Sequence, residues 1–494
     1  MHATARPILF VGSSGNGMFN PMLVLAGELA RRGVPDLWFA ADAHRCGEID
    51  GIPSGPPVSG LTSSAVSSAT SEGAAQEGRH RVQAHSPASG ASQSSTVRST
   101  VTFASLGDEI PELSPTSWDD ATYRRITQRS TRKAMHAAAL HTLEPSLRLD
   151  KYERLDAIVR KIKPALMIVD TISAFAARLA IAHGIPYVLA APFMPSNVLF
   201  PKVPKGFPVP NSGLGLQMTR AQRMTNRLFP LRVLGLLRHP RIVRALTRFV
   251  QARKRLGIPP HTGKRTAVAD NASLILCHTA PGVDYPIPLP PKLRVLGAMI
   301  PPLPEAPGAD LLRWLGKHES IVYIGLGTIT RLTAHQVATL VDVVRKLDDH
   351  QVLWKLPRAQ QALLPADLPP NLRIESWLPS QLDVLAHPNV KVFVNHAGGG
   401  SFHEGLYFGK PMVLYPLWVD CHDQAVRGED AGVSRTLNDP LELDDAVHKI
   451  RQVLTDDSFR TRAEHFRQSQ LEAGGREAAA DAILALDLER LATA

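Results

Sequence analysis

The sequence predicts an α/β protein built from two parallel β-sheet domains that face each other across a cleft. Strand-like apolar runs alternate with helical patterns in the first half, and the same alternation starts again in the second half. The chain of 494 residues is also too long for one compact core. Because such sheets bind ligands at the carboxyl ends of their strands, we expect the site to lie between the two domains.

The first half begins with strand, turn, helix and strand over residues 7–48, read from "PILFVG", "GSSGNGMFNP", "MLVLAGELARRG" and "DLWFAAD". From about 51 to 100 the composition changes to Ser, Ala and Gly, and we expect a disordered insertion there because such a segment buries too little apolar surface. The segment "VTFASL" resumes the fold. A long helical stretch over about 118–162 precedes "ALMIVD", a buried strand that ends on Asp170.

The segments "HGIPYVLAA", "ASLILCHT" and "KLRVLGAM" continue the first domain, which we assign to residues 1–298. The proline-rich residues 299–308 are expected to form a linker. The second domain, 309–475, repeats the alternation with "SIVYIGLGT", "AHQVATLVDVVRKL", "HQVLWKL", "LRIESWLP", "VKVFVNHAGGG" and "PMVLYP". Residues 476–494 are expected to form a helix that packs back on the first domain.

The positive charge is concentrated in one region. The formal net charge is +10, and 16 Lys or Arg lie between Asp170 and Asp270 without any acidic residue. Within residues 228–256, apolar side chains follow helical spacing while Arg241, Arg244, Arg248 and Arg255 lie toward the other side. Two interpretations stay open, namely an ordinary surface helix with solvated arginines and peripheral contact with an anionic membrane. Nucleic acid is not expected, because no nucleic-acid motif is visible.

Cysteine usage and hydropathy predict a cytoplasmic protein. The three cysteines, Cys46, Cys277 and Cys421, are far apart and form no CxxC pair, which argues against a disulfide framework and a zinc site. No signal-peptide pattern is visible at the N-terminus, and no apolar run reaches the length of a transmembrane helix.

The stretch "VNHAGGGSFHEGLYFGKP", residues 394–411, places three glycines between a strand pattern and a helix pattern. Glycines at such a turn let a ligand approach the main chain, and the N–H groups of a helix start can hold an anion. The motif therefore predicts a phosphate site. A tight turn that is rich in glycine for its own sake is the alternative.

The surrounding residues, 377–424, read "WLPSQLDVLAHPNVKVFVNHAGGGSFHEGLYFGKPMVLYPLWVDCHDQ". This run resembles the donor-binding signature of the family 1 UDP-glycosyltransferases, in their soluble fungal or eukaryotic form. The segments "ILFVG…NPMLVLAGELARRG", "VYIGLGT" and "VLWKLP" are similar as well. The resemblance covers nearly the whole chain outside the insertion. It implies the two-domain GT-B fold and a UDP-sugar donor.

The resemblance assigns the donor-binding roles. It implies that Trp377 stacks on the uracil and that Glu404 accepts hydrogen bonds from the ribose hydroxyls. The diphosphate is assigned to a group of side chains and N–H groups, and Gln381 also belongs to the donor site. The diphosphate group comprises Thr328, His396, Gly398, Gly399, Gly400 and Ser401. No cofactor or metal is expected, because the helix start supplies the donors to the leaving group.

Two departures from the family pattern concern the sugar and the proton. Where the family ends its signature with adjacent Asp-Gln, this chain has Asp420 followed by cysteine, and the pair Asp423 and Gln424 comes three residues later. We expect Asp420 to contact the sugar, with the later pair as the alternative. In the first domain, Met18 occupies the place of the family's catalytic histidine, while Asp170 matches the carboxylate that orients this histidine.

The resemblance implies an inverting transferase that moves a hexose to a small apolar acceptor such as a lipid, terpenoid, polyketide or phenol. Because a thioether takes no proton at neutral pH, Asp170 could be the base, directly or through a water, or a residue of the basic region could supply it. Alternatively, the chain binds its ligands without transfer. An acidic acceptor would need little help from a base.

A third class of function is a nicotinamide-dependent oxidoreductase. It would use the glycines of "GSSGNG", which form a weak pattern without a clear acidic residue after the second strand.

Overall fold

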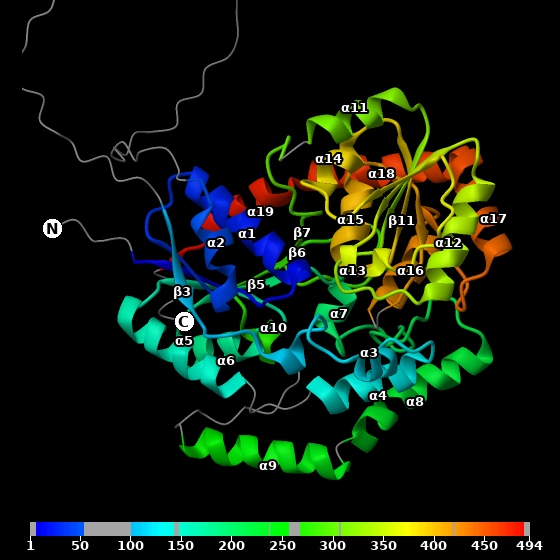
Figure 1. The fold of residues 1–494 in the computed structure, drawn as a ribbon. Helices are drawn as coiled ribbons and strands as arrows, with labels where there is room; N and C mark the ends of the chain where they lie inside the picture. The colour runs from blue at the N-terminus through cyan, green and yellow to red at the C-terminus, as the bar shows by residue number, and fades with distance from the viewer. Residues whose placement is uncertain are drawn as a thin grey trace, which may run out of the picture.

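The computed structural model describes residues 6–53, 100–142, 148–236, 238–255, 267–305, 308–417 and 420–488. The predicted insertion at 51–100 therefore falls almost wholly outside the described residues. Figure 1 shows two α/β lobes, one from each half of the chain. Within the described residues the first lobe has a seven-stranded sheet and the second a six-stranded sheet, and all paired strands are parallel. The predicted α/β class with two parallel sheets is confirmed.

The strand order of the first sheet is β3-β2-β1-β4-β5-β6-β7, and that of the second is β10-β9-β8-β11-β12-β13. The first sheet contains β1 (Ile8–Val11), β2 (Leu37–Ala41), β3 (Val101–Ser105), β4 (Leu166–Asp170), β5 (Tyr187–Ala191), β6 (Leu274–Cys277) and β7 (Leu293–Val295). The second contains β8 (Ile321–Gly325), β9 (Gln351–Lys355), β10 (Leu372–Glu375), β11 (Val390–Asn395), β12 (Met412–Leu414) and β13 (Ser434–Thr436). In each sheet the order reverses beside the first strand, which is where such sheets bind ligands.

The helices of the first half are α1 (Asn16–Arg31), α2 (Cys46–Asp50), α3 (Asp120–Ile126), α4 (Thr131–Thr142), α5 (Leu149–Ile162), α6 (Ala174–Ala182), α7 (Pro195–Leu199), α8 (Arg220–Leu236), α9 (Pro240–Arg255) and α10 (Ala267–Asn271). Two short 3-10 helices cover Ala43–Arg45 and Pro111–Leu113. Those of the second half are α11 (Ala309–Lys317), α12 (Ala334–Lys346), α13 (Arg358–Gln361), α14 (Gln381–Ala386), α15 (Gly399–Tyr407), α16 (Cys421–Asp430), α17 (Leu443–Thr455), α18 (Asp457–Ala473) and α19 (Gly475–Leu484).

Each sheet is covered on both faces, which explains why its strands read as continuous apolar runs. In β1, Ile8 and Phe10 pack into the layer under α1, whereas Leu9 and Val11 pack into the layer under α5 and α6. Successive side chains of a strand point to opposite faces, so a strand buried on both sides has no polar positions. Strand β8 follows the same rule in the second sheet.

The predicted helical stretch over 118–162 is several helices rather than one. Helix α3 ends at Ile126, α4 runs from Thr131 to Thr142, and α5 starts at Leu149. Asp119 caps the start of α3 by accepting a hydrogen bond from the Thr122 N–H at 2.6 Å. Local capping thus sets boundaries that the apolar periodicity alone does not reveal.

Direct hydrogen bonds hold the two lobes together. The guanidinium of Arg331, in the second lobe, donates to the Trp118 carbonyl at 2.7 Å and to Asp120 at 2.9 Å, and the Arg331 N–H donates to the Tyr123 hydroxyl at 3.0 Å. On another side of the interface, Gln470 accepts from the Ala298 N–H at 2.7 Å. These bonds connect segments far apart in sequence and fix the relative position of the two sheets.

Helix α19 lies beside α1, so the end of the described chain returns to the first lobe (Figure 1). Ala479, Ala480 and Ile483 belong to the same buried cluster as residues of α1. Arg32 near the end of α1 also forms an ion pair with Asp481. The apolar contact ties the second lobe to the first through the chain itself.

Shortening the buried side chain of α19 should weaken this attachment. Ile483 is 3% exposed, whereas its neighbour Leu484 is 50% exposed. We expect Ile483→Ala to lower the free energy of unfolding by about 2–4 kcal/mol, because it leaves a cavity in the shared core. Leu484→Ala is the matched control and should change it by less than about 0.5 kcal/mol. Equal effects of both substitutions in denaturant unfolding would contradict this packing.

Candidate active site

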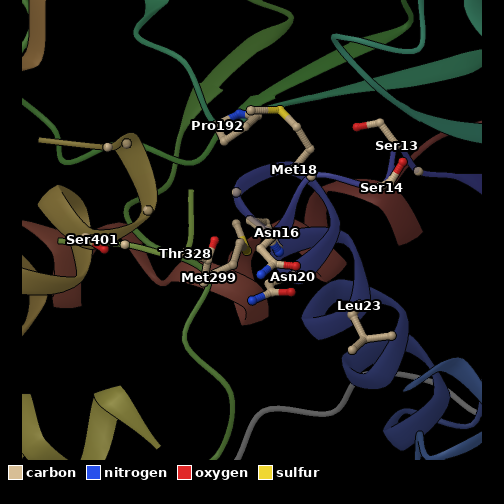
Figure 2. Close-up of a pocket in the computed structure, with 18 of the residues that line it drawn as sticks. Ser13, Ser14, Asn16, Met18, Asn20, Leu23, Pro192, Met299, Thr328 and Ser401 are labelled. Carbon is tan, nitrogen blue, oxygen red and sulfur yellow. The ribbon is translucent and has the colours of Figure 1, made fainter. Parts of the chain in front are cut away.

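A cavity of about 1500 Å³ lies between the two lobes, at the carboxyl ends of the strands of both sheets. Figure 2 shows its two sides, with Met18 and Asn20 of α1 on the first-lobe side and Thr328 and Ser401 on the second-lobe side. The topology of the sheets places the cavity where the sequence predicts a ligand.

Most of the residues that the resemblance assigns to the donor lie on the second-lobe wall of this cavity. Trp377 is 67% exposed, so its indole face is free to meet a flat ring. The predicted residues on this wall are Thr328, Trp377, Gln381, His396, Gly398, Gly399, Gly400, Ser401, Glu404 and Asp420. Residues that lie far apart in the chain are thus brought together by the segments that follow β8, β10, β11 and β12.

The start of α15 presents free N–H groups to the cavity. The first hydrogen bond of this helix runs from the Phe402 N–H to the Gly398 carbonyl at 2.9 Å, and no side chain caps the helix. The N–H groups of Gly399, Gly400 and Ser401 precede this bond, so the helix itself provides them with no acceptor. Together with the helix dipole, they form a site suited to an anion.

The three glycines of the motif lack a side chain for different physical reasons. This refines the prediction that all three admit a ligand. A Cβ on Gly398 would overlap the imidazole of His396, and so would a Cβ on Gly327. A Cβ on Gly399 would come within 3.2 Å of the Pro192 carbonyl in the first lobe. Only at Gly400 is the nearest atom at an ordinary distance, 3.8 Å. Two of the three glycines therefore make room for protein groups.

The tight turn before α15 directs His396 into the cavity. Ala397 has a φ of 59°, in the left-handed region that costs energy for a residue with a Cβ. Its N–H donates to the side-chain oxygen of Asn395 at 2.8 Å, which stabilises the turn. Burial lowers the pKa of His396 to about 4, so the imidazole is neutral near pH 7. A neutral ring donates one hydrogen bond and accepts another.

A hydrogen-bond network orders the region around Glu404. The Gln381 amide donates to the Glu404 carboxylate at 2.8 Å, and the Gln381 carbonyl accepts from the Tyr323 hydroxyl at 2.9 Å. Burial raises the pKa of Glu404, while the bond from Gln381 and the charge of Lys355 oppose this shift. Lys355 also lines the cavity, at the end of β9. Sequence reasoning did not single out this lysine.

Asp423 and Gln424 lie behind the wall, whereas Asp420 lies on it. The Asp423 carboxylate accepts hydrogen bonds from the N–H groups of Asn211 at 2.6 Å and Gly213 at 2.8 Å, both in the first lobe. The geometry therefore gives Asp423 a structural task between the lobes. Of the two alignments that the sequence allowed, only the one with Asp420 brings a carboxylate to the cavity.

The first lobe contributes a mainly apolar chamber. Its described walls come from the segment before α3, from α4 and α6, and from the loop after β5. The apolar side chains are Ile110, Leu113, Trp118, Met135, Phe175 and Phe193. Such a surface suits an apolar ligand that leaves water.

Asp170 lies beneath this chamber and does not belong to the described cavity lining. Its buried carboxylate accepts hydrogen bonds from the N–H groups of Ser13 at 2.5 Å and of Ile172 and Ser173 at 2.7 Å each, and from the Ser173 hydroxyl at 3.1 Å. Burial raises the pKa of Asp170, and these bonds act in the opposite direction. Because its oxygens are occupied, the carboxylate is better placed to position the β1–α1 loop than to take a proton from a ligand.

Met18 lies in the first turn of α1 and lines the cavity, pointing toward Pro192 (Figure 2). The basic region contributes no Lys or Arg to the described lining; from residues 200–270 only Asn211 takes part.

His278, at the end of β6, lines the cavity with both ring nitrogens unpartnered among the described residues. Burial lowers the pKa of His278 to about 3, which makes it a weak proton acceptor at neutral pH.

The glycine pattern "GSSGNG" forms the loop between β1 and α1. An acidic residue, Asp42, directly follows β2, which corrects the expectation that none clearly ends this strand. However, Asp42 is 3% exposed and forms an ion pair with Lys151, and it accepts a hydrogen bond from the Ser14 hydroxyl at 2.5 Å. Its carboxylate is thus occupied by protein groups rather than left for a ribose.

Residues 84–470 match the family described as "UDP-glucoronosyl and UDP-glucosyl transferase". The chain belongs to this family. The match includes the whole described second-lobe wall of the cavity. The predicted resemblance to UDP-glycosyltransferases is confirmed, and the motif around the three glycines is the part of the chain that carried it.

Individual relatives match shorter parts. The ecdysteroid UDP-glucosyltransferase of the Orgyia pseudotsugata multicapsid polyhedrosis virus is 31% identical over 207 residues, 40% of this chain and 42% of that protein. UDP-glycosyltransferase UGT4 of Dactylopius coccus is 29% identical over 205 residues, 40% of this chain and 39% of that protein. The chain thus spans about two fifths of the length of these relatives.

Solved structures share the fold over nearly the whole chain. A glycosyltransferase of kitacinnamycin has a TM-score of 0.64 at 18% identity and covers 99% of both chains. The UDP-glucose: anthocyanidin 3-O-glucosyltransferase in complex with UDP has a TM-score of 0.60 at 16% identity, covering 99% of this chain and all of that one. The GT-B fold that the resemblance implies is confirmed.

Two further properties bear on partners. Within the described ranges, no helix combines the length and the apolar character needed to cross a bilayer. The described residues also contain no group of three or more His, Cys, Asp or Glu placed to hold a metal ion.

Single glycine-to-alanine substitutions test why each of these positions lacks a side chain. We expect Gly398→Ala to displace His396, and so to weaken UDP binding at least about tenfold and lower the free energy of unfolding by about 1–3 kcal/mol. Gly399→Ala should also destabilise the contact with the first lobe. Gly400→Ala is the matched control, and thermal unfolding should show little change. Calorimetric titration with UDP that ranks the Gly398 and Gly400 variants equally would contradict the geometry.

Proposed function

We propose that this protein is an inverting glycosyltransferase that transfers a hexose from a UDP-sugar to a small apolar acceptor. The observation that carries this proposal is that a polar donor-binding wall and an apolar wall line the same cavity. One wall carries the family's donor residues around the start of α15, and the other is the apolar chamber of the first lobe. Family membership supports UDP-sugar chemistry, whereas acceptor and stereochemistry belong to the proposal.

The donor lies along the second-lobe wall. Trp377 stacks on the uracil, and Glu404, ordered by Gln381, accepts hydrogen bonds from the ribose hydroxyls. The diphosphate lies at the N-terminus of α15, where His396, Ser401 and the free N–H groups donate to it. Thr328 closes the other side, and Asp420 contacts the sugar hydroxyls.

The transfer is a single displacement at the anomeric carbon. The acceptor oxygen in the chamber attacks the face opposite the diphosphate, so the configuration inverts. Negative charge grows on the leaving diphosphate in the transition state, and donors already in place lower the barrier. In this arrangement the N–H groups and side chains of the helix start stabilise the leaving group, and no metal is required. Asp170 acts as a positioning residue for the β1–α1 loop.

The experiment is product formation with UDP-glucose, UDP-galactose, UDP-xylose and UDP-glucuronic acid against phenolic, terpenoid and hydroxy-lipid acceptors. We expect a glycoside whose anomeric configuration, read by NMR, is opposite to that of the donor. Restoring a base with Met18→His should raise kcat/KM for alcohol acceptors at least about tenfold, because general-base catalysis is worth about a hundredfold or more. The control is Met224→His, an exposed methionine outside the cavity.

A protein that binds UDP-sugars but yields no product with any of these pairs or with a carboxylic acid acceptor, before and after Met18→His, would refute the transferase. It would instead support a binding protein that has lost turnover. If the protein bound a nicotinamide dinucleotide saturably and did not bind UDP, the oxidoreductase class would be favoured.

The protein is proposed to act in the cytoplasm with peripheral contact to anionic membrane. Its three cysteines form no disulfide among the described residues, which fits a reducing compartment. The predicted basic helix consists of α8 and α9, and α9 lies at the edge of the first lobe (Figure 1). Ile242 and Ala245 of α9 are buried, whereas Arg241, Arg244 and Arg248 are exposed. The apolar face of α9 thus packs on the protein, and contact with lipid would be electrostatic.

Liposome co-sedimentation tests the membrane contact. Each exposed Lys or Arg near an anionic surface contributes about 1 kcal/mol, so we expect pelleting with phosphatidylserine vesicles that decreases as salt rises. The triple variant Arg241→Gln, Arg244→Gln, Arg248→Gln should lose most of it. A control with the same charge change in the second lobe, at Arg313, Arg451 and Arg460, should keep it. Equal pelleting with neutral and anionic vesicles would reject the contact and leave the transferase untouched.

A further inference from the structure

Arg148 is a cation on the first-lobe side of the cavity. It immediately precedes α5 and lines the cavity, yet its guanidinium has no hydrogen-bond or ion-pair partner among the described residues. Lys151, one turn further along, also lines the cavity but pairs with Asp42 and donates to the Asp108 carbonyl at 3.0 Å. The two neighbouring cations therefore differ, because only Arg148 is left to meet a ligand.

The environment of Arg148 indicates the charge of the ligand that it would bind. Arg148 lines the same cavity as the apolar side chains of the chamber, and the charged Asp42 and Lys151 line it as well. Partial burial lowers the pKa of Arg148, while the charge of Asp170 opposes the shift. A guanidinium withdrawn from water without a direct partner loses solvation that an anionic ligand can replace. Its planar fork of N–H groups fits a carboxylate in two parallel hydrogen bonds.

A second donor lies on the same side of the chamber. The Ser13 hydroxyl lines the cavity and is buried without a partner among the described residues. Asp170 relates the two groups, because it accepts the Ser13 N–H and its charge acts on Arg148. The Ser13 hydroxyl and the Arg148 guanidinium thus both lie near the end of β4. Met18, which occupies the place where the resemblance predicts a histidine, lines the same cavity.

We propose that the acceptor is a small apolar carboxylic acid, whose carboxylate is held by Arg148 and the Ser13 hydroxyl and is itself the nucleophile. This proposal rests on the transferase function above and names its acceptor class. A carboxylate oxygen forms the new bond to the anomeric carbon, and the bond from that carbon to the diphosphate oxygen breaks. UDP leaves with the electron pair. No proton is transferred, so the step needs no base, and the product is a glycosyl ester.

The test compares acceptors that differ only in the reacting group. With 4-phenylbutyric acid and 4-phenylbutanol as a matched pair, the donors named above are supplied to the full chain. We expect the acid to react with a kcat/KM at least about tenfold higher than that of the alcohol. The product should be cleaved by hydroxylamine, as an ester is and a glycoside is not. The same assay with a phenol reports on the transferase function independently of the acid.

Variants at Arg148 separate binding of the acid from the fold. We expect Arg148→Gln to raise KM for the acid by about tenfold to a hundredfold, because a charged hydrogen bond is worth about 1.5–3 kcal/mol. KM for the phenol and the affinity for UDP should not change. Arg148→Lys should restore part of the loss. The control Arg160→Gln removes an exposed arginine of α5 outside the cavity and should have no effect.

Four results would overturn the assignment. One is transfer to the phenol with the acid inert, which leaves the transferase standing. Another is an equal effect of Arg148→Gln on acid and phenol at unchanged thermal stability. The third is a preference for UDP-glucuronic acid that Arg148→Gln abolishes, since the arginine would then bind the donor sugar. Absence of product with acid, alcohol and phenol alike would refute both the acceptor class and the transferase.

Discussion

The carboxylate of Asp170 holds together the first-lobe side of the cavity. It accepts three backbone N–H bonds and one hydroxyl bond, and two of these donors belong to Ser173 and one to Ser13. Because β1 and β4 are neighbours in the sheet, these bonds join the ends of both strands and fix the loop that leads into α1. The position of Met18 and the electrostatic environment of Arg148 both depend on this group. Because the same bonds occupy its oxygens, Asp170 is poorly placed to accept a proton from a ligand.

The second lobe meets this arrangement with a wall shaped by one turn. Gly327 and Gly398 enclose the His396 ring, and Gly399 lets the Pro192 carbonyl of the first lobe approach. The glycines that suit an anion at the start of α15 therefore also close the two lobes on each other. Asp423 strengthens this closure through the N–H groups of the loop at 211–213. Recognition of the donor and contact between the lobes are in this way built from the same segment.

The sequence could predict what is encoded locally. Apolar runs such as that of β1 specify buried parallel strands, and the compact motif around His396, Ser401 and Glu404 places the donor wall. It could not predict which group each glycine accommodates, or that Asp423 bonds to a loop more than two hundred residues away, because these depend on packing between distant segments. The sequence also offered no reason to select Arg148, because an arginine before a helix is ordinary until the structure places it in the lining of the cavity.

The pH dependence of kcat/KM for a carboxylic acid acceptor tests most directly whether the cavity operates without a general base. An acid with a pKa near about 4.3 is already ionised above about pH 6. We predict a flat profile from about pH 6 to about pH 9 for the unmodified protein at saturating donor. A rising limb with an apparent pKa near about 7 would reveal a proton acceptor in the enzyme–donor complex and would contradict transfer to an already ionised nucleophile.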